Sequence, residues 1–139
     1  MRVVIDTNVL RLTIKKTNFE RFIYNAFKNE AFDWVVSTEI LAEYEEKLIE
    51  FYSTQTADLV LGILENAPNV VFAEPYFRWN IITEDPDDNK FADLAISLNV
   101  DCLITNDRHF KIFKKLEFPK LKVLTPKQFE KFLNEFIIR

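Results

Sequence analysis

The sequence contains very few of the residues on which many enzyme classes depend, with one glycine, one cysteine and one histidine among 139 residues. The single glycine, Gly62, excludes a glycine-rich phosphate loop and a dinucleotide-binding fingerprint. With Cys102 alone, an internal disulfide and a cysteine-based zinc site are excluded. With His109 alone, metal motifs that need two histidines are excluded as well. The available chemistry therefore comes from carboxylates, hydroxyls, amides and basic side chains.

Long apolar runs are also missing, since the longest contain four or five residues, and this excludes a membrane-spanning segment. A carboxylate, Asp6, follows the opening apolar run too early for a signal peptide. Together with the lone cysteine, these features predict a cytoplasmic protein without a membrane partner.

The pattern of apolar residues predicts one α/β domain over residues 1–139, because the length suits a single domain and strands alternate with helices throughout. Such alternation requires crossover connections, so we expect a central parallel sheet of about five strands flanked by helices on both faces. Strands are predicted at 2–5, 33–37, 69–73, 102–105 and 121–124. Helices are predicted from a capping box at Thr17 and Glu20 to about 28, at 38–52, 57–65 and 87–99, through Phe110 and Phe113, and from a cap at Thr125 onward.

Carboxylates follow two of the predicted strands. Asp6 comes directly after the first strand, and Asp107 comes shortly after the fourth. Because ligands of parallel sheets bind beyond the carboxyl ends of the strands, these two side chains are expected to converge. Asp88 stands three residues before Phe91 on a predicted buried stripe, and Glu43 stands beside Tyr44 on another. Taken singly, each acid has an ordinary structural explanation as a strand end, helix cap or turn residue.

Four segments together resemble the PIN-domain nucleases, and in particular their VapC-like branch, the toxins of toxin–antitoxin pairs. The resemblance covers essentially the whole chain, in order, and rests on Val4-Ile5-Asp6-Thr7-Asn8-Val9-Leu10, Ser37-Thr38-Glu39-Ile40-Leu41-Ala42-Glu43-Tyr44, Asp85-Pro86-Asp87-Asp88-Asn89-Lys90-Phe91 and Leu103-Ile104-Thr105-Asn106-Asp107. In this branch a glycine is common at the position of Asn106, and the substitution could alter the reach of that loop.

The resemblance implies which residues form the active site. The family's catalytic and metal-binding acids fall on Asp6, Glu43, Asp88 and Asp107, with Asn8 and Thr105 in supporting places. Asp93 matches an additional acid of the branch and is either an auxiliary ligand or a solvated residue. Asp87 is the alternative to Asp88 for the third acidic position. We favour Asp88, because the spacing of Ala92 and Ala95 after it matches the family better.

Clustered carboxylates suit Mg²⁺ or Mn²⁺, because these cations prefer oxygen ligands and relieve the repulsion between the acids. The family therefore implies a Mg²⁺- or Mn²⁺-dependent endoribonuclease that hydrolyses RNA phosphodiesters, is neutralised by a small antitoxin and pairs as a homodimer. The alternatives are an RNA-processing or DNA-directed nuclease of the same fold without a toxic role, or a binding module that has lost turnover.

Charge is distributed unevenly, although its sum is only −4. Residues 83–107 contain seven acids and one base, whereas residues 108–131 contain eight bases and two acids. We expect four of these bases to hold the RNA backbone beside the acids, namely Arg108, Lys111, Lys114 and Lys115.

Two further features have more ordinary explanations. The aromatic run Tyr76-Phe77-Arg78-Trp79 could stack bases, but in a chain with 14 phenylalanines, packing in the core or at a dimer interface is the favoured interpretation. His109 is interpreted as a loop residue rather than a ligand.

Overall fold

The computed structural model describes residues 1–138 and contains a fully parallel sheet of five strands in the order β3-β2-β1-β4-β5. The chain first adds strands on one side of β1 and then returns to add strands on the other side. The sheet order therefore changes direction between β1 and β4, which are neighbours in the register Ile5↔Ile104. The strands are β1 (Arg2–Ile5), β2 (Asp33–Val36), β3 (Val70–Phe72), β4 (Cys102–Ile104) and β5 (Val123–Leu124).

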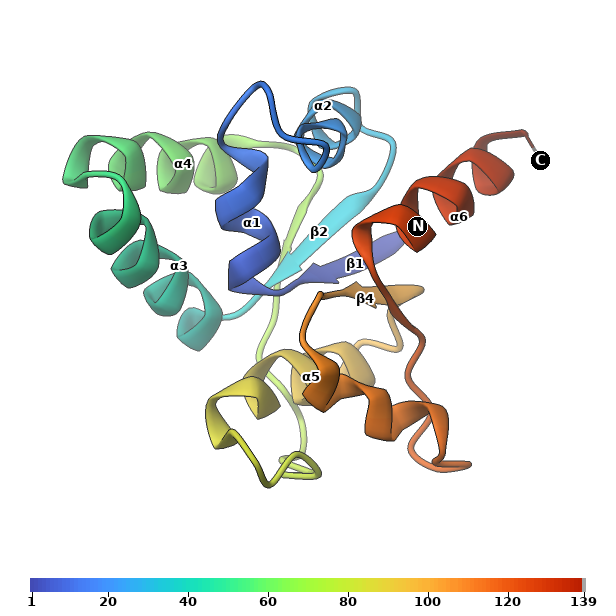
Figure 1. Ribbon diagram of the computed structural model, residues 1–139. Helices are drawn as coiled ribbons and strands as arrows, with labels where there is room; N and C mark the ends of the chain where they lie inside the picture. Colours follow the sequence, from blue (N-terminus) through green and yellow to red (C-terminus); the bar gives the residue numbers. More distant parts are fainter. Residues whose placement is uncertain (139) are drawn as a thin grey trace.

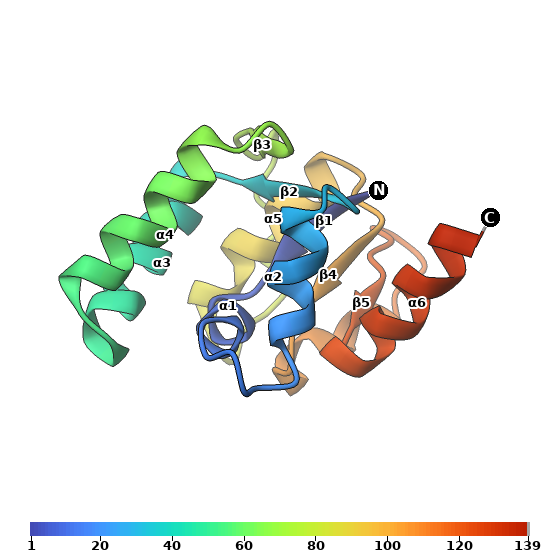
Figure 2. The same cartoon turned by 90° about the horizontal axis from the view of Figure 1, so that it is seen from above.

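Helices cover both faces of this sheet, as the alternating pattern predicts. Figure 1 shows α5 below the strands, α2 and α6 above them and α1 beside them, while Figure 2 shows α3 and α4 side by side at one end of the molecule. The helices are α1 (Thr7–Thr13), α2 (Arg21–Lys28), α3 (Thr38–Phe51), α4 (Thr54–Asn66), α5 (Asn89–Ser97) and α6 (Pro126–Ile138), with 3-10 helices η1 (Pro86–Asp88) and η2 (Arg108–Lys114).

The central strands are buried on both faces, which explains their continuous apolar sequence. Val3, Val4 and Ile5 of β1 are fully buried, as are all three residues of β4. Strands with no solvent-facing side need no polar alternation, so short apolar runs form them. This packing fixes the two strand ends from which the carboxylates emerge.

Hydroxyl side chains begin two of the long helices, and one sequence-predicted cap is confirmed. Ser37 and Ser53 accept hydrogen bonds from the backbone N–H groups three residues ahead, at the starts of α3 and α4. At α6, Thr125 Oγ1 accepts from Gln128 N at 3.2 Å, and Gln128 Oε1 accepts from Thr125 N at 2.9 Å. This is the reciprocal capping box that the sequence predicts, with Pro126 at the first helical position.

Two local expectations are wrong. The capping box at Thr17 and Glu20 does not form, because α2 begins at Arg21 and Glu20 makes no side-chain cap. The structure also contains α1, which the apolar pattern does not predict; it begins immediately after Asp6 and has only seven residues. Most strands are one or more residues shorter than predicted. Within residues 1–138, no helix is long and apolar enough to cross a membrane.

Candidate functional site

Asp6 and Asp107 lie at the carboxyl ends of the adjacent strands β1 and β4, and one hydroxyl joins them. Thr105 Oγ1 donates a hydrogen bond to Asp6 Oδ2 at 2.7 Å and accepts one from the backbone N–H of Asp107 at 2.9 Å. Thr105 and Asp6 are both buried. Because β1 and β4 flank the point where the sheet order changes direction, this is the position where parallel sheets bind ligands.

Burial governs the charge of Asp6. Its removal from water, together with the charges of Glu43 and Asp107, raises the pKa of Asp6 from 3.8 to about 6, while the hydrogen bond from Thr105 acts in the opposite direction. Ionisation of an acid in this environment opposes folding unless a positive charge joins it.

Glu43 is brought to the same edge by α3. The hydroxyl of the neighbouring Tyr44 donates to the carbonyl of Ile5 at 2.5 Å, which fixes α3 against the end of β1. Both carboxylate oxygens of Glu43 have partners: Thr7 Oγ1 donates to Oε2, and Lys90 Nζ contacts Oε1 at 2.6 Å. The ion pair is largely shielded, with side chains 14% and 18% exposed. The positive charge of Lys90 thus already balances the negative charge of Glu43.

Asp88 is buried where η1 meets α5, and His109 links it to Asp107. The ring Nδ1 of His109 lies 3.2 Å from Asp88 Oδ2 and 3.3 Å from Asp107 Oδ1. Burial, followed by the charges of Asp107, Asp85 and Asp6, raises the pKa of Asp88 to about 7, and the contact with His109 opposes this. The same contact raises the pKa of His109. The interpretation of His109 as an ordinary loop residue is therefore wrong.

The rivals of Asp88 lie differently. Asp87 is exposed on the outer side of η1. Asp93 is buried, but its Oδ1 accepts a hydrogen bond from the backbone N–H of Trp79 at 3.0 Å, so this oxygen binds the segment before α5. Asn8 is exposed in the first turn of α1.

The sequence does not reveal three residues that the structure adds to this region. Lys90 pairs with Glu43, and Asp85 and His109 lie with Asp88 so that one ligand atom from each falls within 4.8 Å of the others. Asp85 is part of the segment that carries the family resemblance, and the proximity of His109 to Asp107 in sequence is the only signal for the histidine. Their contacts depend on how the two 3-10 helices turn.

This donor set fits a divalent cation. Carboxylate oxygens are the ligands that Mg²⁺ and Mn²⁺ prefer, and the buried acids Asp6 and Asp88 have raised pKa values that a cation would lower. Asp85, Asp88 and His109 bring one ligand atom each within 4.8 Å of one another, and Asp107 contacts the same His109 ring at 3.3 Å. Asp6 lies at the adjacent strand end, joined to the Asp107 backbone through Thr105.

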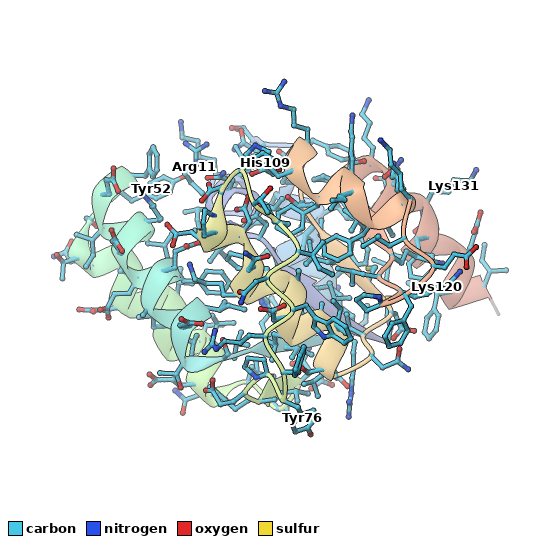
Figure 3. The ribbon with its side chains drawn as sticks, turned by 90° about the horizontal axis from the view of Figure 1, so that it is seen from below. Arg11, Tyr52, Tyr76, His109, Lys120 and Lys131 are labelled. Carbon is cyan, nitrogen blue, oxygen red and sulfur yellow. The ribbon has the colours of Figure 1, made fainter. Side chains whose placement is uncertain are left out.

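Basic side chains border the acids on one side. A hollow of about 50 Å³ is lined by Asp107 and by Arg108, Lys111 and Lys114, which project from η2. Lys115, at the end of η2, is exposed. Figure 3 shows His109 and Arg11 at the same margin of the molecule when it is seen from below.

Comparison with known proteins identifies the family. The model of the PIN domain family matches residues 2–109, and the chain therefore belongs to the PIN domain family. PIN domains are generally nucleases that use divalent metal ions. No curated protein matches the chain by sequence.

Solved structures show the same fold. The chain is similar to VapBC2 from Rickettsia felis bound to a DNA fragment from their promoter, with 21% identity, a TM-score of 0.63, and 90% of this chain and 98% of that chain covered. It is also similar to FitAcB from Neisseria gonorrhoeae, with 16% identity, a TM-score of 0.56 and 89% and 97% coverage. FitAB bound to an IR36 DNA fragment gives 15% identity, a TM-score of 0.57 and 89% and 94% coverage.

Proposed function

We propose that this protein is a Mg²⁺- or Mn²⁺-dependent endoribonuclease, and that Asp6, Glu43, Asp88 and Asp107 form its active site. The observation that carries the proposal is the convergence of Asp6 and Asp107 through Thr105, with Asp88 held beside them by His109. A PIN domain with this arrangement of acids is suited to hydrolysis of a phosphodiester, and the basic side chains of η2 suit a polyanionic substrate.

Each residue has a separate task in this proposal. A bound divalent cation would supply Lewis-acid chemistry to the phosphodiester and lower the pKa of a water molecule. Asp6, Asp88 and Asp107 would bind the cation, and Thr105 would orient Asp6 and the loop of Asp107. Glu43, with its charge balanced by Lys90, would act beside them as an acceptor for water protons. Arg108, Lys111 and Lys114 would hold the RNA backbone next to the acids.

We further propose that the protein is the toxin of a toxin–antitoxin pair, acts in the cytoplasm, forms a homodimer and is inhibited by a small antitoxin. Support comes from the similarity to the VapBC2 and FitAB structures, whose names are those of two-component complexes. Exposed large apolar side chains, such as Leu59 at 67% and Phe72 at 55%, are available for contacts with a partner or a second copy.

The decisive experiment is incubation of the purified protein with total RNA, with Mg²⁺, with Mn²⁺ and with chelator, followed by mapping of the ends produced. We expect metal-dependent cuts that leave 5′-phosphate and 3′-hydroxyl ends. Asp6→Asn and Asp107→Asn should each lower the cleavage rate by at least about 100-fold while leaving the circular dichroism spectrum unchanged.

Asp87→Asn is the matched control, since the side chain of Asp87 is exposed beside the site, and it should cut like the parent. Full activity of either Asp6→Asn or Asp107→Asn would contradict the assignment of the acids. Cleavage of single-stranded DNA in place of RNA would instead favour the DNA-directed alternative, and tight RNA binding without cleavage would favour the binding module.

A further inference from the structure

A second, larger hollow lies beyond η2 at the edge of the sheet where β5 enters. Its volume is about 520 Å³, and its walls include the apolar side chains of Phe113, Leu116 and Leu121. Three lysines line it, Lys114, Lys120 and Lys122, all of them exposed. Lys122 Nζ also lies 4.6 Å from the centre of the Phe132 ring, so Lys114 and Lys120 are the freer of the three.

Lys114 connects this hollow to the acidic site. It lines the large hollow and also the small one that contains Asp107, Arg108 and Lys111. Arg108, Lys111, Lys114 and Lys120 therefore form a basic row that leads from Asp107 along η2 to the far hollow. Figure 3 shows His109 near one end of this row and Lys120 beyond the other, on the same face of the molecule.

Exposed aromatic rings stand next to the far end of this row. Phe118, between Leu116 and Lys120, is 76% exposed, and its ring centre lies 5.4 Å from that of Trp79. Trp79 in turn lies 4.9 Å from Phe77, which is 60% exposed. Packing in the core is therefore the wrong interpretation for Phe77 and for Tyr76, which is 83% exposed. Phe118 comes from the segment after η2, whereas Phe77 and Trp79 come from the segment before α5.

We propose that Lys114, Lys120 and the rings of Phe118, Trp79 and Phe77 form a second binding region for single-stranded RNA. This region lies apart from the acids and is joined to them by the basic row. This rests on the proposed function, because the row leads to the proposed cleavage site. Lysines that follow a backbone beside rings that stack bases are the combination by which single-stranded nucleic acid is held without sequence preference.

Single-stranded RNA fits this surface better than an acidic peptide does. Both polymers would satisfy the lysines, but only nucleic acid also presents flat bases to the rings. A duplex would satisfy the lysines and keep its bases stacked on one another, leaving the rings unused. The surface should therefore prefer unpaired RNA to either of the other two.

The test measures binding in chelator by fluorescence anisotropy, using labelled single-stranded RNA of about 16 nucleotides. Lys120→Gln should weaken binding and lower the slope of log K against log salt concentration by about 0.7 to 1, the value for one lost phosphate contact. Phe118→Leu should weaken binding roughly tenfold without changing that slope, because stacking does not release counterions. Lys131→Gln, which removes the same charge from an exposed position on α6 (Figure 3), should bind like the parent.

Parent-like binding by both Lys120→Gln and Phe118→Leu would overturn this inference and leave the cleavage proposal intact. Conversely, if the variants bind RNA weakly and the parent never cuts it, the cleavage proposal fails and the binding region stands. Duplex RNA and polyglutamate are the competing probes. Equal weakening of duplex binding by Phe118→Leu, or stronger competition by polyglutamate than by unlabelled single-stranded RNA, would overturn the assignment to single-stranded RNA.

Discussion

At the scale of single residues, the acids of the site differ in how their charge is balanced. Glu43 has Lys90 at 2.6 Å, and Asp88 has His109 at 3.2 Å. Asp6 is 4% exposed and accepts a hydrogen bond from the uncharged Thr105. Of these three acids, Asp6 is therefore the one whose side chain has no charged partner, and a cation would supply that charge.

Asp6 should make the metal-free protein lose stability as the pH rises. An acid whose pKa is raised on folding, here to about 6 from 3.8, is protonated at low pH without cost and opposes folding once it ionises. The penalty grows from about pH 4 to pH 6 and reaches roughly 3 kcal/mol above that range. Urea unfolding of parent and Asp6→Asn should thus show the parent losing stability relative to the variant between pH 4.5 and pH 7.5.

The exposed acid Asp87 provides the control for this measurement, because Asp87→Asn should follow the parent across the same range of pH. If the difference in unfolding free energy between the parent and Asp6→Asn is the same at both pH values, the raised pKa of Asp6 is wrong.

The ion pair of Lys90 with Glu43 gives a second prediction at this scale. Lys90→Met keeps the apolar stem and leaves the Glu43 charge largely buried without its partner, which should lower the unfolding free energy in chelator by about 1–3 kcal/mol. Mn²⁺ should raise the unfolding free energy of Lys90→Met by more than it raises that of the parent. Lys47→Met breaks the exposed pair with Glu50, three residues further along α3, and should have little effect on the unfolding free energy, because solvent screens this pair. An equal loss of unfolding free energy in Lys90→Met and Lys47→Met would contradict the view that burial makes the Lys90–Glu43 pair the more important one.

At the scale of elements, side chains of α5 hold the irregular segment between β3 and η1. Asn89, Asp93 and Ser97, one turn apart, each accept a hydrogen bond from the backbone of this segment, from Ile82, Trp79 and Tyr76 respectively. Asn89 also donates to the carbonyl of Ile82 at 2.8 Å. One face of α5 therefore positions the rings of Phe77 and Trp79, while its first turn positions Lys90.

Asp93→Ala should loosen this segment without affecting metal binding. Loss of the acceptor for Trp79 N should increase amide hydrogen exchange over residues 76–82, whereas the rise in melting temperature caused by Mn²⁺ should equal that of the parent. Asp93→Asn retains an oxygen acceptor and should show less exchange than the alanine variant. A reduced response to Mn²⁺ in Asp93→Asn would instead make Asp93 an auxiliary ligand.

The same scale separates what the sequence predicts from what it does not. Asp6 and Asp107 can be placed together from the sequence alone, because both follow buried parallel strands. The short helix α1 has no strong signal, since its seven residues contain three apolar ones. The contacts of His109 depend on the 3-10 helix η2, and the hydrogen bond of Asp93 depends on the irregular segment that contains Trp79. Neither stretch has a periodic sequence pattern that predicts its conformation.

At the scale of the whole molecule, the site is assembled from four distant parts of the chain. The repulsion between its acids and the binding of a cation therefore both affect the stability of the fold. Asp6 follows β1, Glu43 lies on α3, Asp88 begins α5 and Asp107 begins η2. Unfolding separates these acids and ends their repulsion, and it also destroys the place where a cation would bind. The protein without metal should therefore be less stable than its core alone would make it.

A divalent cation that binds only the folded state should raise the melting temperature. The gain is about 2.7 kcal/mol when free metal is a hundredfold above its dissociation constant, which corresponds to an increase on the order of 5 °C for a domain of this size. Because burial and neighbouring acids raise the pKa of Asp88 to about 7, metal-free Asp88→Asn should melt at or above the metal-free parent. The same substitution should reduce the gain from Mn²⁺, since one oxygen ligand has lost its charge.

Thermal melts of the parent, Asp88→Asn and Asp87→Asn, each in chelator and in millimolar Mn²⁺, distinguish the two neighbouring acids. Asp87 is exposed, so its variant should keep the full increase, whereas the buried Asp88 should account for much of it. If Asp88 served only to begin α5, asparagine would replace it without loss, because both residues are good helix caps. An equal Mn²⁺-induced increase in the parent and in Asp88→Asn would therefore remove Asp88 from the metal site.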